Sequence, residues 1–200
     1  ELGKVTEDDH KSDGYDKGHL CASEDRVYCK EANDQTFFYS NISPQIGSFN
    51  QKYWAKLEAL IQKWGRSTQQ GVFDKVYVAK GGTINKLLKD WIGKQKANDG
   101  LYPTADADGK SNPKSKNGLV VPAYYYMAIL AEKDGKFQAI GFLVPHSEDL
   151  PAKPTTEDLQ KYTCSIDYLE EQTGLDFFCN LMDTIEDEVE ASFRLEDWQW

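Results

Sequence analysis

The chain has 200 residues, of which 40% are hydrophobic, and its formal net charge is −10 at pH 7. This length suits one domain with a sizeable core, so we predict a single domain over residues 1–200. The apolar runs are only strand-length, which excludes a transmembrane helix, and the acidic balance excludes a uniformly basic nucleic-acid-binding surface. The polar, acidic first residues indicate no signal peptide, unless one has been removed.

The first third of the chain contains a histidine in a distinctive setting. Residues 1–15 are polar and predict an entrance loop, in which His10 is expected to be solvated. Gly18 then precedes His19, and a glycine there permits an unusual backbone angle or a close approach beside the imidazole. Residues 36–40 have the β-branched and aromatic composition of a short strand.

A helix is predicted after this strand, with Ser48 as its N-cap. Its apolar residues recur at helical spacing and predict a buried stripe, made of Tyr53, Leu57, Leu60, Ile61 and Trp64. Asn50, Trp54 and Glu58 are spaced by four residues and form roughly one column of the helix. Asn50 and Glu58 are therefore expected to look into one cleft, which His19 faces from the preceding strand.

The later elements follow from turn and cap signals. A strand is predicted over residues 72–79, a helix or extended run over 84–92, and a long loop over 93–118. Residues 119–132 and 137–144 predict a hairpin that turns at 133–136. Helix starts are expected at Thr155 and Ser165, a further acidic helix at 183–190, and a docked tail at Trp198 and Trp200. His146 follows a strand, and no role is assigned to it.

Four cysteines allow three pairings. The simplest expectation is two local bridges, Cys21–Cys29 and Cys164–Cys179, and these would indicate an oxidising compartment. The alternative is buried free thiols. A Cys₄ zinc site is not favoured, because no pair of cysteines has the close spacing of zinc ligands.

The residue types around His19 suit phosphodiester hydrolysis. A hard cation such as Mg²⁺ prefers oxygen ligands, and the amide oxygen of Asn50 offers one without cancelling the charge of the cation. Glu58 can orient water near the ion, and His19 can accept a proton from an attacking water. Each residue also has a plainer interpretation: a structural histidine, a helix-capping asparagine and an exposed helix carboxylate.

Three ordered segments resemble the active-site region of the DNA/RNA non-specific endonuclease family. Its pattern D-R-G-H, N-x-x-P-Q and N-x₇-E corresponds here to Asp16, Gly18 and His19, then Asn41, Pro44 and Gln45, then Asn50 and Glu58. Similarity also covers most of the chain after Asp16. The resemblance implies an α+β ββα-metal nuclease fold, with a central mainly antiparallel sheet flanked by helices. It also implies DNA and RNA as substrates, without a membrane partner, and cleavage that leaves 5′-phosphate ends.

The resemblance further implies a role for each matched residue. His19 would be the general base, Asn50 the direct protein ligand of one hydrated Mg²⁺, with Mn²⁺ or Ca²⁺ as alternatives, and Glu58 a holder of the water around it. Asn41 would support the site around His19. We assign Asp16 and Lys17 to substrate binding.

The sequence departs from the family pattern in three ways. Lys17 replaces the arginine of the motif, and Gln62 stands where many members carry a second arginine. The chain also begins only fifteen residues before Asp16, so either an N-terminal strand region of the family is missing or this lineage is shortened. Alternatives are a catalytically weak or inactive binding protein on the nuclease fold, and a metal phosphodiesterase for small substrates. We expect a secreted or periplasmic location, and the oligomeric state stays open.

Overall fold

The computed structural model describes residues 5–11, 14–65, 72–83, 87–90 and 120–200. These residues form two compact units. The first contains residues 1–51, 82–124 and 146–149, and the second contains residues 52–81, 125–145 and 150–200. Among the described residues, no helix has both the length and the apolar character that crossing a membrane requires. The loop predicted at 93–118 lies outside the described residues.

The first unit contains two small antiparallel sheets and several short helices. Strand β1 (Asp16–His19) pairs with β2 (Ile42–Gln45), in a register that places Gly18 opposite Ser43 and His19 opposite Ile42. Strand β4 (Leu87–Asp90) pairs with β5 (Val120–Pro122). The helix between β1 and β2 is α1 (Lys30–Gln35), and the 3₁₀ turns are Glu7–His10, Ser23–Arg26 and Tyr39–Asn41.

Three local predictions for this unit are wrong. Residues 36–40 do not form a strand, because the N–H groups of Thr36, Phe37 and Phe38 donate to carbonyls at the end of α1 and keep the backbone in turns. His10 is buried, with 4% exposure, and its ring stacks on Tyr39 at 5.4 Å. Ser48 is not an N-cap but lies within the helical segment, directly before the π-helix Phe49–Trp54.

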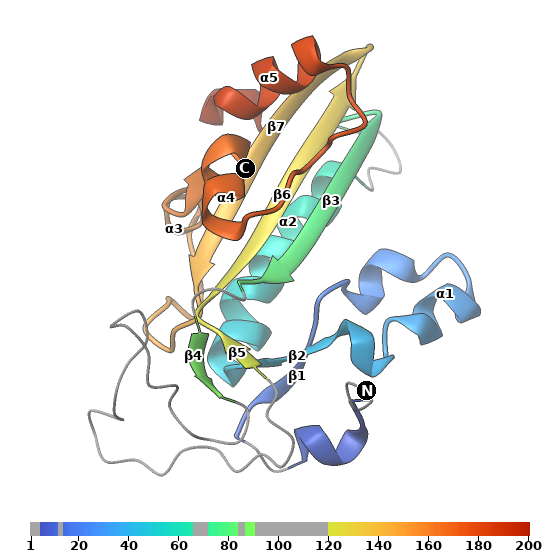
Figure 1. The fold of residues 1–200 in the computed structure, drawn as a ribbon, viewed down its shortest axis with the longest axis vertical. Coiled ribbons are helices and arrows are strands. Elements are labelled where there is room, and N and C mark those ends of the chain that lie inside the picture. The colour runs from blue at the N-terminus through green and yellow to red at the C-terminus, as the bar shows by residue number, and fades with distance from the viewer. Residues whose placement is uncertain (1–4, 12–13, 66–71, 84–86, 91–119) are drawn as a thin grey trace. The chain divides into compact units, whose positions relative to one another are not determined.

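The second unit is a four-stranded sheet with helices on both faces (Figure 1). The strand order is β3 (Lys75–Gly82), β6 (Tyr124–Lys133), β7 (Lys136–Pro145) and β8 (Thr163–Cys164). Helix α2 (Ala55–Gly65) lies on one face, and α4 (Ile166–Thr173) and α5 (Asp183–Ala191) lie on the other. The remaining elements are α3 (Thr156–Gln160) and the 3₁₀ turn Leu195–Asp197.

The side chains of β6 alternate between two apolar layers, as a sheet buried on both faces requires. Tyr126, Ala128 and Leu130 join a cluster with residues of α4 and α5. Tyr125 points to the other layer, where its ring lies 5.7 Å from that of Trp54, the last residue of the π-helix before α2. The predicted stripe of the helix is confirmed, because Tyr53, Leu57, Leu60, Ile61 and Trp64 are all buried.

Several turn and cap predictions are confirmed. The β6–β7 hairpin turns at Asp134 and Gly135, both with positive φ as a two-residue hairpin turn requires. Thr155 caps α3 by accepting the Asp158 N–H, and Ser165 caps α4 in the same manner. The tail docks as expected, since Trp198 packs on Trp64 at 4.7 Å.

The prediction of two disulfides is wrong, because all four cysteines are free thiols. Cys29 instead caps α1, where its sulfur accepts the Ala32 N–H. Cys164 pairs with Gly141 across the sheet, and burial raises the pKa of its thiol to about 12. Cys179 is exposed. Each predicted pair is close in sequence, but its two thiols have separate structural settings.

Candidate functional site

The Asp16 carboxylate orients the predicted metal ligand in the first unit. Its Oδ2 accepts hydrogen bonds from Nδ2 of Asn50 at 3.0 Å and from Nε2 of Gln51 at 2.7 Å. Because the Asn50 amide nitrogen is directed at Asp16, this bond leaves the amide oxygen for other contacts. An amide oxygen is the atom that a hard cation needs, so the donor chemistry of Asn50 fits Mg²⁺. Asp16 thus orients the side chain of Asn50, and its assignment to substrate binding stays a prediction.

His19 ends β1 and is half-buried against an aromatic ring. The edge of one ring meets the face of the other in the His19–Phe37 pair, with centroids 4.9 Å apart and planes at 90°. Phe37 is 55% exposed and Phe38 is 59% exposed. Both line an open depression of about 500 Å³ together with Val5, Tyr39 and Ser40. The imidazole therefore adjoins an exposed apolar surface.

Asn41 forms hydrogen bonds with the backbone directly after His19. Its Oδ1 accepts the Cys21 N–H at 2.9 Å, and its Nδ2 donates to the carbonyls of Cys21 and Thr36, each at 2.8 Å. Its own carbonyl accepts the Leu20 N–H at 2.9 Å. The two bonds to Cys21 cross twenty residues of sequence and hold the chain directly after the histidine, which is a supporting role of the kind that the resemblance implies.

Gly18 is required because the Gln45 side chain lies across it. A Cβ atom on Gly18 would stand 2.2 Å from Cδ and Oε1 of Gln45, far inside contact distance. Gln45 is fully buried, and within the described part of the chain neither of its amide atoms has a hydrogen-bond partner. The glycine of the motif thus serves close packing between β1 and β2 beside His19.

Lys17 contacts the protein itself. Its ammonium lies 3.7 Å from the Glu7 carboxylate and 5.6 Å from the centroid of the Tyr39 ring. The side chain is 42% exposed, so these contacts leave a large part of it in solvent. A phosphate that binds Lys17 has to compete with Glu7.

Glu58 belongs to the second unit, where a lysine faces it. Nζ of Lys80, on β3, lies 3.1 Å from Oε1 of Glu58. The two side chains are only 9% and 16% exposed, in that order, so this is a largely buried ion pair. No sequence pattern indicated Lys80, because 22 residues separate it from Glu58 and the two lie on different elements.

His146 is a buried residue with a structural role that the sequence analysis did not predict. Its Nε2 accepts the Ile46 N–H at 2.6 Å, and its Nδ1 lies 2.8 Å from the Pro122 carbonyl. These partners require a neutral ring with the proton on Nδ1. Burial lowers the pKa of His146 to about 4, which matches that state. Since the Ile46 carbonyl accepts the Asn50 N–H at 2.9 Å, His146 anchors the turn that leads to Asn50.

The first unit thus brings together part of the predicted site. Asp16 contacts Asn50, and the contacts of Asn41 lie directly after His19. Glu58 lies in the other unit, so its predicted convergence with His19 and Asn50 stays a prediction.

Comparison with known proteins gives a consistent result. A family model described as DNA/RNA non-specific endonuclease matches residues 3–184. Mitochondrial endonuclease G of Homo sapiens is 28% identical over 184 residues, which are 90% of this chain and 53% of that protein. Nuclease C1 of Cunninghamella echinulata var. echinulata is 30% identical over 185 residues, 90% of this chain and 63% of that protein.

The fold is similar to that of a protein of known structure. A chain in the crystal structure of the EndoG/EndoGI complex superposes with a TM-score of 0.65 at 26% identity, covering 90% of this chain and 66% of that one. The α+β ββα-metal nuclease fold is thereby confirmed: β1 and β2 are the strands, and the helical segment from Phe49 to Gly65 follows them. The chain spans a little over half the length of the human relative.

Proposed function

Because this chain belongs to the DNA/RNA non-specific endonuclease family, we propose that it is a metal-dependent endonuclease that hydrolyses phosphodiester bonds in DNA and RNA. The products expected are 5′-phosphate ends. The observation that carries the proposal is the hydrogen bond between Asp16 and Asn50. It directs the amide nitrogen of Asn50 to one side, while β1 carries His19 three residues after Asp16.

Three residues of this chain have separate roles in the proposed hydrolysis. Asn50 holds the metal through its amide oxygen. His19 accepts the proton of the attacking water, for which a neutral imidazole is suited near pH 7. Glu58 orients the water around the ion. When bound, Mg²⁺ supplies the positive charge that stabilises the leaving oxygen.

Substrate contact is proposed along the aromatic surface beside His19. A base of a nucleic-acid strand can stack on an exposed aromatic ring, and Phe37 and Phe38 offer such rings. Lys17 adds one positive charge near this surface. Because positive side chains make the phosphate contacts, binding is expected to weaken as salt increases.

The test is cleavage of supercoiled plasmid and of RNA by the full chain, with Mg²⁺ or with chelator. His19→Ala is expected to lower the rate by about 10²–10⁴-fold, the usual contribution of a general base, and imidazole in solution should restore part of it. Asn50→Ala is expected to abolish cleavage, while Gln51→Ala, which loses the neighbouring bond to Asp16, serves as the matched control and keeps most activity.

The outcomes separate the candidates. Full activity of His19→Ala contradicts its role as base. Tight DNA binding without cleavage in Mg²⁺, Mn²⁺ or Ca²⁺ favours a binding protein on the nuclease fold. Hydrolysis of a dinucleotide but not of long DNA favours a phosphodiesterase for small substrates.

Location stays a separate proposal. We expected a secreted or periplasmic protein, but the free thiols remove one reason for it, and the relatives include enzymes named as mitochondrial. Fractionation of the native host, with the chain detected by antibody, tests it directly.

A further inference from the structure

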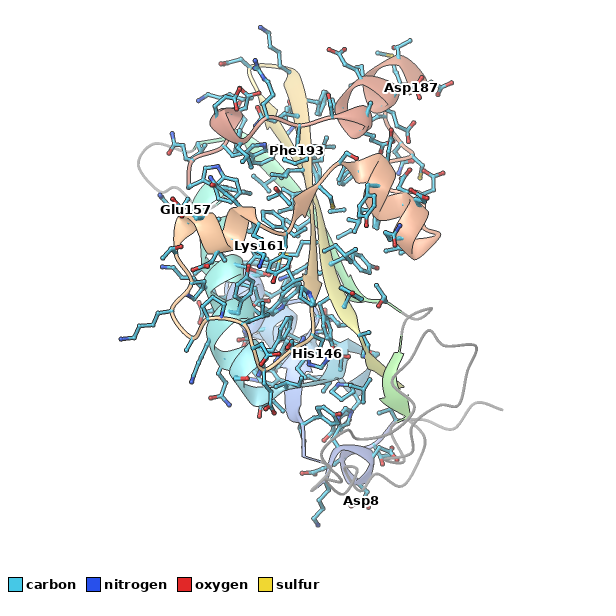
Figure 2. All side chains as sticks on the ribbon, turned by 90° about the vertical axis from the view of Figure 1, so that its left-hand side faces the viewer. Asp8, His146, Glu157, Lys161, Asp187 and Phe193 are labelled. Atoms are coloured by element: carbon cyan, nitrogen blue, oxygen red, sulfur yellow. The ribbon has the colours of Figure 1, made fainter. Side chains whose placement is uncertain are left out.

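Helices α4 and α5 carry an extreme concentration of carboxylates. Residues 165–193 contain nine Asp or Glu residues and no Lys, Arg or His. The two helices lie side by side on one face of the second unit's sheet, and Asp187 points outward from α5 (Figure 2). Exposed acidic residues on a helix are ordinarily only a solvated face, so charge alone assigns nothing here.

Three of these carboxylates converge. One oxygen each of Asp167, Glu170 and Glu190 lies within 4.8 Å of the other two. Asp167 and Glu170 are three residues apart on one side of α4, and Glu190 comes from the last turn of α5. Like charges at this spacing repel one another unless a cation lies between them.

Glu190 gives an independent reason to expect a ligand. Its residue is 6% exposed, and within the described part of the chain its buried Oε1 has no hydrogen-bond partner. Val189 beside it packs in the apolar cluster beneath the helices. A buried carboxylate without a donor or cation is strongly unfavourable. The charged groups that act on it are all acidic: Glu170, Glu186, Asp167 and Asp176.

We propose that Asp167, Glu170 and Glu190 form a divalent-cation site, separate from the Asn50 site, that ties α4 to α5. The cation neutralises the carboxylates, including the buried one of Glu190. Glu170 is already positioned, because its Oε1 accepts the Phe177 N–H at 2.6 Å. The site is structural, and it does not depend on the proposed nuclease activity.

The donor set favours Ca²⁺ over Mg²⁺. Ca²⁺ takes six to eight oxygen ligands in a flexible geometry, whereas Mg²⁺ demands a near-ideal octahedron and loses its waters reluctantly. Three carboxylates from two helices therefore suit Ca²⁺ better. Waters can complete its six to eight oxygens, because Asp167 is exposed.

The test uses the full chain with Asn50→Ala, so that the Asn50 site does not contribute. Calorimetric titration with CaCl₂ after chelator treatment should show one site. At about 50 times the Kd, Ca²⁺ should raise the Tm by about 5 °C or more, because it binds only the folded state. MgCl₂ is titrated in parallel and is expected to bind more weakly.

Three variants decide the assignment. Glu190→Gln should abolish the Ca²⁺-dependent Tm shift, and Asp167→Asn, at an exposed position, should weaken binding at least about 10-fold without unfolding the protein. Glu188→Gln, an exposed carboxylate on the same helix, is the matched control and should bind as the parent does. No Ca²⁺ binding by the parent, or unchanged binding by both Glu190→Gln and Asp167→Asn, overturns the proposal; the first result would mean that Glu190 holds a proton instead.

Discussion

Replacing Gly18 by alanine tests the packing that supports His19. The added Cβ would lie 2.2 Å from two atoms of the Gln45 side chain and 2.5 Å from its Cγ, so one of the two strands has to shift. Gln45 cannot swing into solvent easily, because it is 0% exposed and lies in β2, paired with β1. Overpacking of this kind costs about 1–3 kcal/mol in unfolding free energy.

Urea unfolding followed by fluorescence measures this loss. The midpoint should fall with an unchanged slope, which shows altered stability and not an altered denatured state. Gly47→Ala is the matched control: its Cβ would meet Asp16 Oδ1 at 3.4 Å, an ordinary contact, so a change within about 0.5 kcal/mol is expected.

A second substitution makes the reasoning refutable. In Gly18→Ala combined with Gln45→Ala, the clashing atoms are gone, so the two single losses should fail to add by about 1 kcal/mol or more. Strict additivity, or a Gly18→Ala protein as stable as Gly47→Ala, would show that the side chain of Gln45 is not what requires a glycine.

Further predictions concern buried polar groups. Lys80→Met breaks the largely buried ion pair with Glu58, so the unfolding free energy should fall by about 3–5 kcal/mol, as for other broken buried pairs. The exposed pair of Lys75 with Glu132 is the control, and an unchanged Lys80→Met protein contradicts the buried pair. The pKa of His146 is about 4 in the folded protein and about 6.5 in the unfolded chain, so the unfolded state binds the proton first. The unfolding free energy should therefore fall by about 3 kcal/mol as pH falls from 6.5 to below 4. His146→Gln should flatten that dependence relative to wild type, and parallel pH curves would refute it. In thiol labelling of the native protein, the two exposed cysteines should react quickly and Cys164 slowly, since burial disfavours its thiolate; equal rates would contradict this.

The sequence by itself determined the elements that depend on near neighbours. The stripe from Tyr53 to Trp64, the cap at Ser165 and the turn at Asp134 and Gly135 rest on periodicity or on hydrogen bonds within a few residues. The ordered motif from Asp16 to Glu58 also sufficed to indicate the family, because its spacing is a property of the chain alone.

Predictions from local composition were wrong where a neighbouring element supplies hydrogen bonds or contacts. Residues 36–40 have a strand-like composition, but their N–H groups are taken by the end of α1. Cys29 is close in sequence to Cys21, yet it serves as a helix cap. Composition indicates only an average preference for helix or strand, and specific hydrogen bonds from a neighbouring element can override that preference.

Only the tertiary structure decided the long-range partners. His146 meets Ile46 across 100 residues, and Lys80 meets Glu58 across 22. The convergence of Glu190 with Asp167 likewise depends on how α5 returns to α4. Such contacts depend on the path of the whole chain through the core, and no spacing in the sequence encodes that path.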